Sequence, residues 1–473
     1  MIALTLAEIA DIVGGTLVAP PTAVVTGTVE FDSRRVGPGG LFLALRGDRV
    51  DGHDFVPAAL AAGAVAALVT RPVPGPHILV ADGLAALAAL AARVVRRLPA
   101  TVVGVTGSSG KTSTKDLLAQ LLGRLGPTVA PPGSFNNELG HPYTVLRAGT
   151  DTRFLVLENS ARGIGHIRYL AAIAPPRIGV VLNVGSAHLG EFGSREAIAR
   201  AKGELVEALP ADGLAVLNAD DPLVLGMRGR TAARVRTFGR DPGADVRAEA
   251  VRADDLGRAG FTLVTQGTRA PVRLRLVGAH HIGNALAAAA VATECGMTVP
   301  EAADALTAAG PVSHWRMEVT ERPDGAVVIN DAYNANPESM RAALETLAAI
   351  AAARSARPVA VLGEMAELGP QGPTEHARTG RLAVELGIAR LVAVGEAARA
   401  YDTGTTGFRW VPDAAAALAL LRAEIGPGDV VLVKASRAAS LERIALAIAE
   451  DGLAAAGPAG SRADRDEGGG SRA

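Results

Sequence analysis

The segment Gly104–Leu118 has the composition of a phosphate-binding loop between a strand and a helix. Backbone N–H groups at the start of such a helix bind anions, a lysine neutralises phosphate charge, and a threonine hydroxyl can reach Mg²⁺. The spacing is GxxGKT, because Val105 stands where the longer common form of the loop has a glycine. The sequence therefore predicts a site for a nucleotide triphosphate, formed by Gly107, Ser108, Ser109, Gly110, Lys111, Thr112 and Ser113.

Two residues farther along the chain could complete a metal site beside this loop, and a lysine follows them. Glu158 ends a predicted strand and His188 follows the next one, so both would lie at the sheet edge where α/β proteins bind ligands. Mg²⁺ prefers oxygen ligands, which favours Glu158 for direct contact and gives His188 a second site or an indirect role. Lys202 lies in a helical pattern, and its residue type alone is more typical of a solvated lysine.

Polar residues in the second half of the chain are further candidates. Asn284 begins an apolar helix, where its amide could also simply cap the helix. Arg316 lies where two regions of the chain meet, so it could reach a phosphate or form an interdomain ion pair. Asp331 ends a predicted strand, and Asn334 and Asn336 follow it in a loop. Turn chemistry explains these asparagines equally well.

The elements that must position these residues form three α/β regions. Residues 1–99 alternate short strands and helices, beginning with a helix that ends at Gly14. Residues 100–311 repeat strand, loop and helix, with the continuous apolar strands of a buried, mostly parallel sheet. The pattern restarts near Pro311, which predicts a Rossmann-like unit over residues 312–455. Residues 456–473 offer almost nothing to bury, and we expect a disordered tail there.

Composition excludes several classes of function. The formal net charge of the 473 residues is −1, which gives no general attraction to nucleic acid or to an anionic membrane. The chain has one cysteine, Cys295, so no intramolecular disulfide can form. The N-terminus lacks the basic region of a signal peptide, and the apolar runs are too short to span a bilayer. We therefore expect a cytoplasmic protein without membrane insertion.

Together, these motifs resemble the Mur ligase family. The motifs that carry the resemblance are TGSSGKT, FLVLE, NVGSAHLGEFGS with AKGE, HHIGNALAAAA, WRMEV and VINDAYNANP, over about residues 25–450. The family's loop has the GxxGKT form, which accounts for Val105. The resemblance implies a three-domain fold with a small UDP-binding domain, a central ATP-binding domain and a Rossmann-like ligase domain. It also implies an enzyme that forms an amide bond through an acyl phosphate. We expect the protein to be a monomer.

The choice of substrate within the family depends on further segments: DSRRVGPGGLFLALRGDRVDGHDF, NNELGHPYTVL, DAYNANPESM and VLGEMAELG. These resemble the members that join D-alanyl-D-alanine to UDP-N-acetylmuramoyl-tripeptide, the pentapeptide step of peptidoglycan synthesis. A ligase that adds the third amino acid is the alternative, although its D-N-P-R motif is absent. The UDP-site-like segments speak against folylpolyglutamate synthetase. A P-loop kinase or nucleotide switch remains a third class.

The resemblance also implies roles for individual residues. Catalytic roles would fall to Lys111, His188, Lys202 and Arg316, with Lys202 carbamylated by CO₂ into a carboxylate-like metal ligand. Two magnesium sites would use Thr112, Glu158, His188 and the modified Lys202. Asn284, Arg316 and Asp331 would contact ATP. The UDP-linked substrate would bind Ser33, Arg34, Gly47, Asp51, His53, Asn136, Asn137, Arg162, Asn334 and Asn336.

The chain departs from the family pattern directly after Glu158. The family commonly has an apolar residue and then glycine there, whereas this chain has Asn159 and Ser160. Because glycine reaches backbone conformations that serine rarely adopts, we expect an altered backbone beside the metal or the peptide pocket.

Overall fold

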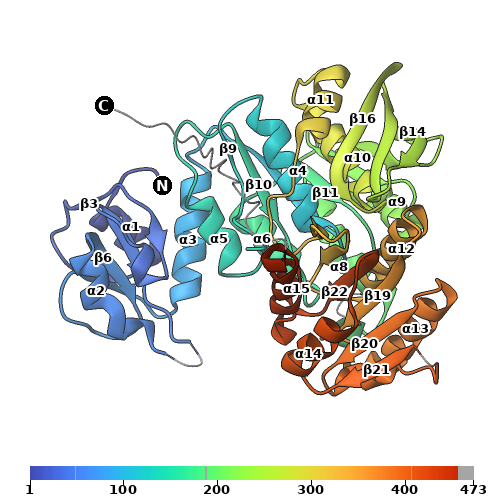
Figure 1. Cartoon of the computed structure of the whole chain (residues 1–473). Coiled ribbons are helices and arrows are strands. Elements are labelled where there is room, and N and C mark those ends of the chain that lie inside the picture. Colours follow the sequence, from blue (N-terminus) through green and yellow to red (C-terminus); the bar gives the residue numbers. More distant parts are fainter. Residues whose placement is uncertain (48–49, 187–188, 406, 456–473) are drawn as a thin grey trace, which may run out of the picture.

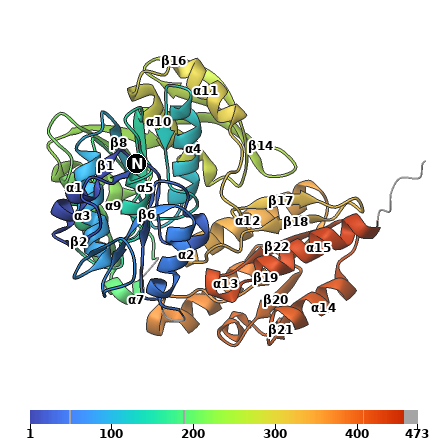
Figure 2. The same cartoon turned by 90° about the vertical axis from the view of Figure 1, so that its left-hand side faces the viewer.

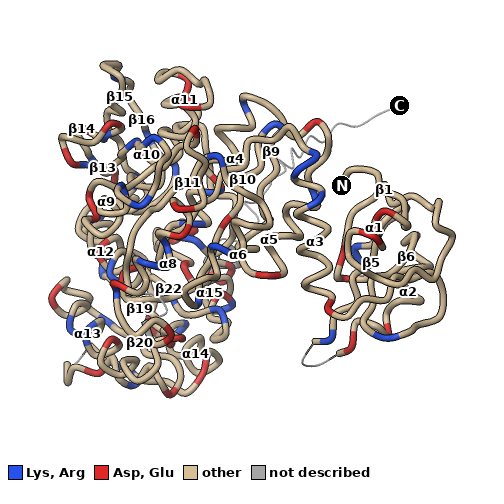
Figure 3. The backbone as a smooth tube through the Cα atoms, turned by 180° about the vertical axis from the view of Figure 1, so that it is seen from behind, with Lys and Arg blue, Asp and Glu red and all other residues tan. Residues whose placement is uncertain are grey.

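Three α/β units follow one another along the chain, each built around its own sheet (Figure 1). The structure is a computed structural model that describes residues 1–47, 50–186, 189–405 and 407–455. The tail predicted for residues 456–473 lies outside the described residues. In the described part of the chain, no helix is long and apolar enough to cross a membrane. Basic and acidic residues are interspersed along the chain (Figure 3).

The first unit contains a five-stranded sheet in the order β2-β7-β6-β5-β4 and a separate β1–β3 pair. The predicted helix forms as α1, which starts at a Thr5–Glu8 capping box and ends at Gly14 with φ +61°. The elements are β1 (Leu4–Thr5), α1 (Leu6–Val13), β2 (Thr16–Val18), β3 (Val24–Val25), β4 (Val29–Glu30), η1 (Ser33–Arg35), β5 (Gly40–Leu43), η2 (Gly52–Phe55), α2 (Val56–Ala61), β6 (Ala64–Val69), β7 (His77–Leu79) and α3 (Gly83–Val95).

The second unit is a nine-stranded sheet in the order β16-β15-β14-β13-β12-β11-β8-β10-β9. Its strands are β8 (Thr101–Thr106), β9 (Thr128–Val129), β10 (Phe154–Glu158), β11 (Ile178–Val181), β12 (Leu214–Asn218), β13 (Arg234–Gly239), β14 (Val246–Ala253), β15 (Arg258–Thr265) and β16 (Thr268–Val277). The strands from β9 to β14 are parallel, as the apolar runs predict. An antiparallel extension, β14-β15-β16, was not predicted.

Helices cover both faces of this central sheet. They are α4 (Lys111–Gly123), α5 (Gly140–Val145), α6 (His166–Ile173), α7 (Leu189–Phe192), α8 (Arg195–Glu207), α9 (Pro222–Leu225), η3 (Gly226–Arg230), α10 (His281–Glu294) and α11 (Val299–Ala308). Leucines and alanines of α4, α10 and α11 share one core with β8 and β10–β16. The opposite face packs on α5, α6 and α8. The carboxyl ends of the parallel strands are therefore held between two helical layers.

The third unit has six strands in the order β17-β18-β22-β19-β20-β21, all parallel except β17 (Figure 2). Helices α12 and α13 cover one face, and α14 and α15 cover the other. The elements are β17 (Glu318–Glu321), β18 (Val327–Asn330), α12 (Pro337–Ala353), β19 (Arg357–Leu362), η4 (Gly369–Gln371), α13 (Gly372–Glu385), β20 (Arg390–Val394), η5 (Ala397–Tyr401), β21 (Phe408–Val411), α14 (Ala414–Glu424), β22 (Asp429–Lys434), η6 (Arg437–Ala439) and α15 (Glu442–Ala455).

Three aromatic rings join the first unit to the second. The ring of Tyr143, in α5, lies 5.2 Å from that of Phe31 and 5.5 Å from that of Phe135, centroid to centroid. The buried hydroxyl of Tyr143 donates a hydrogen bond to Oε2 of Glu30 at 3.0 Å. Helix α3 packs against α1 on one side and α5 on the other, so the two units share part of one core.

Candidate active site

A cleft of about 440 Å³ opens between the second and third units. Its walls are the loops after β8, β10 and β11 in the second unit and after β18, β19 and β22 in the third. Ligands of α/β proteins bind at such carboxyl ends of strands. The cleft brings together these predicted site residues: Ser108, Ser109, Gly110, Lys111, Thr112, Ser113, Asn136, Asn137, Glu158, Arg162, Asn284, Arg316, Asp331, Asn334 and Asn336.

The phosphate loop connects β8 directly to α4. Gly110 precedes the helix with φ +82°, and a Cβ there would lie 2.5 Å from Oδ1 of Asn284, so glycine is required. Asn284 lies inside α10 beside the loop, and the alternative that its amide caps the helix is wrong. Nζ of Lys111 donates to the carbonyl oxygen of Gly107 at 2.7 Å. Burial lowers the pKa of Lys111, and the nearby carboxylate of Glu158 acts in the opposite direction.

Asn183, which sequence reasoning missed, supports this loop from the neighbouring strand. Its Oδ1 accepts a hydrogen bond from the backbone N–H of Ser109 at 3.0 Å, and its Nδ2 donates to the Ser109 carbonyl at 3.2 Å. Oγ of Ser108 accepts from the N–H of Gly185 at 2.9 Å. Contacts with the chain after β11 therefore fix the loop's conformation. The available signal was a polar residue directly after a buried strand.

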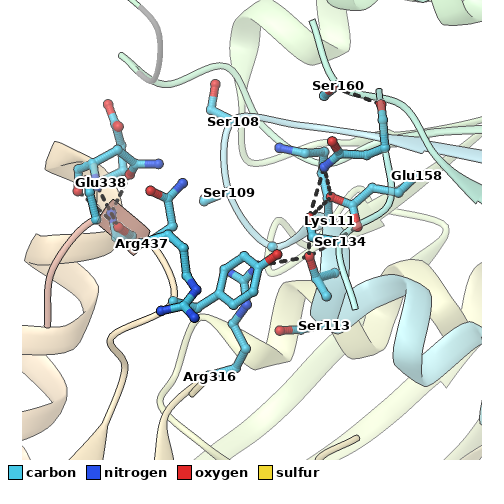
Figure 4. Close-up of a pocket in the computed structure, with 18 of the residues that line it drawn as sticks. Ser108, Ser109, Lys111, Ser113, Ser134, Glu158, Ser160, Arg316, Glu338 and Arg437 are labelled. Carbon is cyan, nitrogen blue, oxygen red and sulfur yellow. Dashed lines mark hydrogen bonds between the residues drawn. The ribbon is translucent and has the colours of Figure 1, made fainter. Parts of the chain in front are cut away.

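Glu158 is almost fully buried at the end of β10 and accepts three hydrogen bonds (Figure 4). Its Oε2 accepts from Oγ1 of Thr112 at 3.1 Å. Its Oε1 accepts from Nδ2 of Asn136 at 2.7 Å and from Oγ of Ser134 at 3.1 Å. A carboxylate and hydroxyls beside a phosphate loop form an oxygen donor set that suits Mg²⁺.

This donor set is small. No three His, Cys, Asp or Glu side chains gather at a possible metal site within the described ranges. An ion beside Glu158 and Thr112 would take its other ligands from phosphate oxygens and water, as Mg²⁺ commonly does. His188, predicted for a second metal site, lies outside the described residues.

Lys202 is buried in α8, only 5% exposed, so the interpretation as a solvated surface lysine is wrong. Burial lowers the pKa of Lys202 well below its usual range, and the like charge of Lys111 lowers it further. Among the residues that the structure describes, no carboxylate pairs with its amine. Lys202 is not among the residues that line the cleft.

Arg316 crosses from the third unit to the second. Its Nη2 donates to Oγ1 of Thr112 at 3.1 Å, and its guanidinium lies 4.0 Å from the ring centroid of Tyr333. Its neighbours Trp315 and Met317 have φ of +59° and +51°. Such left-handed conformations are unfavourable for bulky residues and often occur at functional sites. The backbone on both sides of Arg316 is therefore strained where the arginine enters the cleft.

Asp331 is paired within the third unit. Its Oδ2 accepts from Nζ of Lys434 at 2.5 Å, and its Oδ1 accepts from the N–H of Met317 at 3.1 Å. Burial lowers the pKa of Lys434, while Asp331 opposes that shift. Asp331 thus holds the end of the strained segment beside Arg316. Asn336 caps α12 by accepting from the N–H of Ser339 at 2.9 Å.

The residues predicted to bind UDP lie in the first unit and are not among those that line this cleft. Arg34, next to Ser33, is exposed. Its guanidinium forms two hydrogen bonds with Asp32 and its backbone N–H a third, and these bonds lower the pKa of Asp32 to about 2. His53 is buried, with Nδ1 2.6 Å from Oδ1 of Asp51 and Nε2 accepting from the N–H of Thr70 at 2.9 Å. Gly47 begins the same loop. His53 therefore connects Asp51 to Thr70.

Ser160 is not among the residues with positive φ, so serine occupies this position without left-handed backbone strain. Its hydroxyl donates to the carbonyl of Asn136 at 2.8 Å, so serine adds a bond between two loops of the cleft. Asn159 is buried, and its Oδ1 lacks a hydrogen-bond partner in the described part of the chain.

Glu338 was also missed by sequence reasoning, although it follows the predicted Asn336-Pro337 helix start. It begins α12 in the third unit, and its Oε1 accepts from the N–H of Ser186 in the second unit at 2.6 Å. A Cβ on Gly185 would lie 2.5 Å from its carboxyl carbon. This contact joins the two walls of the cleft. Sequence spacing contains no signal for a contact across 152 residues.

Comparisons with known proteins agree with this architecture. Family models match all three units: "Mur ligase family, catalytic domain" at residues 27–94, "Mur ligase middle domain" at 105–292, and "Mur ligase, glutamate ligase domain" at 315–437. Two similar proteins are named UDP-N-acetylmuramoyl-tripeptide–D-alanyl-D-alanine ligase. The one from Mycobacterium tuberculosis is 54% identical, over 95% of this chain and 98% of its own length. The one from Escherichia coli is 36% identical, over 96% and 100%.

Two solved structures are similar over nearly their whole length. MurF from Acinetobacter baumannii has a TM-score of 0.85 and 33% identity, covering 95% of this chain and 99% of that one. MurF ligase from Thermotoga maritima, in complex with ADP, has a TM-score of 0.80 and 31% identity, covering 91% and 99%. With three matching domain models, full-length relatives and the same three-unit fold, this chain belongs to the Mur ligase family.

Proposed function

We propose that this protein joins D-alanyl-D-alanine to the terminal carboxylate of UDP-N-acetylmuramoyl-tripeptide, with ATP converted to ADP and phosphate. The proposal depends mainly on the cleft, where side chains from two units come together. They are Lys111, Thr112, Glu158 and Arg316. The names of the full-length relatives support the choice of substrates. The product is the pentapeptide precursor of peptidoglycan.

The reaction needs an activated carboxylate, because an amine does not displace oxygen from a free carboxylate at neutral pH. The tripeptide carboxylate attacks the γ-phosphorus of ATP, the bond from that phosphorus to the bridging oxygen breaks, and ADP leaves as the acyl phosphate forms. Lys111 and Arg316 neutralise the charge that develops on the transferred group. The dipeptide amine then attacks the acyl carbon and phosphate leaves. An α-amine has a pKa of about 8, so a useful fraction is neutral without a strong base.

The metal and the modified lysine belong to the same proposal. Thr112 and Glu158 would hold Mg²⁺, which when bound neutralises phosphate charge; a second ion would involve His188. The Lys202 amine would add to CO₂ and release one proton, giving a carbamate with a carboxylate-like end. Its burial without an acidic partner in the described chain supports this, because a neutral amine is the form that reacts.

Each of the three units would bind a different part of the substrates. Residues 1–99 would hold the UDP part through Ser33, Arg34 and the Gly47–His53 loop, residues 100–311 would bind ATP, and residues 312–455 would present the amine. Asn136, Asn137, Arg162, Asn334 and Asn336 would contact the tripeptide, and Asn284 and Asp331 the nucleotide. The protein would act in the cytoplasm, where ATP and UDP-linked precursors are present, and as a monomer, because one chain forms the whole cleft.

A stoichiometry experiment tests the proposal. ADP release is measured with UDP-muramoyl-tripeptide, with and without D-alanyl-D-alanine. Sustained release should require both substrates and should equal the amide formed. A kinase would leave the phosphate on its product, and a nucleotide switch would hydrolyse ATP without either substrate. Lys111→Ala should reduce the rate at least about 100-fold, because it removes a charge that stabilises the transition state.

A further inference from the structure

Arg437 is a cation of the cleft that the mechanism above does not use. It follows β22 at the start of η6 and lines the wall formed by the third unit. Its side chain is 50% exposed. A half-exposed guanidinium facing a substrate cleft is available to an anionic group that enters it.

Two contacts hold the guanidinium of Arg437 in place. Its central carbon lies 4.5 Å from the ring centroid of Trp315, and its Nη1 donates to Oε1 of Glu442 at 2.8 Å. An arginine carries five N–H donors. Within the described ranges, the bond to Glu442 is the one hydrogen bond that this guanidinium makes, so a planar pair of donors remains available to a ligand.

Three other cations of the cleft have partners within the protein. Lys111 bonds the phosphate loop, Arg316 bonds Thr112 and stacks on Tyr333, and Lys434 is paired with Asp331. Arg437 and Glu338 lie on one side of the pocket, with Lys111 and Glu158 on the other (Figure 4). Arg437 therefore lies on the opposite side of the pocket from Lys111 and Glu158 in this view.

We propose that Arg437 binds the carboxylate of the incoming dipeptide. This inference rests on the proposed function, in which the acceptor is a zwitterion with its amine at one end and its carboxylate at the other. Arginine binds carboxylates with two parallel hydrogen bonds, which fixes direction as well as position. An extended dipeptide spans about 7 Å, so anchoring its carboxylate at the third-unit wall lets its amine extend into the cleft.

The strained segment connects this anchor to the phosphate site. Trp315 supports the guanidinium of Arg437, and the next residue, Arg316, bonds Thr112 of the phosphate loop. The residue that supports Arg437 is therefore the direct neighbour of Arg316 in the chain. Arg437 would hold the acceptor and Arg316 the group being transferred, which brings the amine and the acyl carbon together.

Steady-state kinetics with two acceptors test the proposal. The acceptors are D-alanyl-D-alanine and its C-terminal amide, which has the same amine and no carboxylate. In the unaltered protein, KM should be about 10- to 100-fold higher for the amide, because a charge-assisted hydrogen-bond pair is lost. Arg437→Gln should raise KM for the dipeptide by the same factor, leave KM for the amide unchanged, and leave KM for ATP unchanged. Arg437→Lys should fall between.

The matched control is Arg443→Gln, six residues along the chain, which is exposed and lines a separate hollow. It should change neither acceptor's KM. Equal KM values for the two acceptors in the unaltered protein would overturn the proposal without any variant. A rise in KM for UDP-muramoyl-tripeptide instead would overturn it too. If the unaltered protein formed no amide at all, the proposed function itself would be wrong. That result differs from one in which amide forms but Arg437 has no effect on the KM for the dipeptide.

Discussion

Lys202 is buried, and its pKa is lowered by that burial and by the like charge of Lys111. We expect Lys202→Ala to lose most ADP release, because the carbamate's negative end would be missing beside the phosphates. A short carboxylic acid such as acetate should restore part of the rate by occupying the vacated space. Initial rates with and without acetate measure this. Lys202→Arg is the control: it keeps a cation, cannot be carbamylated, and should not be rescued. Full activity of Lys202→Ala would contradict the carbamate.

Asn159 lowers the stability of the fold, because its buried Oδ1 lacks a hydrogen-bond partner in the described part of the chain. Asn159→Leu keeps nearly the same shape and removes the desolvated amide. We expect the free energy of unfolding to rise by about 1–3 kcal/mol, measured by urea denaturation. Asn183→Leu is the comparison: its amide makes hydrogen bonds to the loop, and the change should be destabilising. A destabilised Asn159→Leu would refute this explanation.

At the scale of elements, the sequence predicted what depends on local patterns. The strand Phe154–Glu158, the phosphate loop and the helix ending at Gly14 follow from apolar runs and glycine positions, and each is present. The antiparallel strands β14–β16 were missed, although Thr268–Val277 alternates buried and exposed residues. This alternation is a local pattern that can be seen in the sequence. The strands with which the segment pairs, and their register, cannot be seen there. The roles of Asn183 and Glu338 depend on contacts between distant segments, which spacing does not encode.

Helix α5 offers a test of how the first and second units are joined. Tyr143→Phe removes the hydrogen bond to Glu30 and leaves a buried carboxylate oxygen without this donor. We expect the free energy of unfolding of this junction to fall by about 1–3 kcal/mol. Urea denaturation measures this change. Tyr169→Phe, at an exposed position of α6, is the control and should have little effect. Equal transition midpoints for the two variants would show that the bond contributes nothing.

At the scale of the molecule, the cleft must exclude water from an acyl phosphate. We expect the third unit to close further on the second when substrates bind, pivoting near Pro311–Trp315. Small-angle scattering should give a smaller radius of gyration with an ATP analogue and the UDP substrate together than without ligands. Glu338→Ala removes the Ser186 contact and should make the ligand-free protein more open. Identical scattering with and without ligands would contradict closure.

The short segment from Ser134 to Asn137 has a consequence for all three units. Phe135 packs on Tyr143 and faces Phe31 of the first unit, while its neighbour Asn136 holds the carboxylate of Glu158. One peptide bond therefore separates a residue of the junction between the first and second units from the amide that binds Glu158, the proposed magnesium ligand. A tilt of the first unit on capturing its nucleotide would shift that carboxylate, so arrival of the sugar-linked substrate would be sensed where the triphosphate sits.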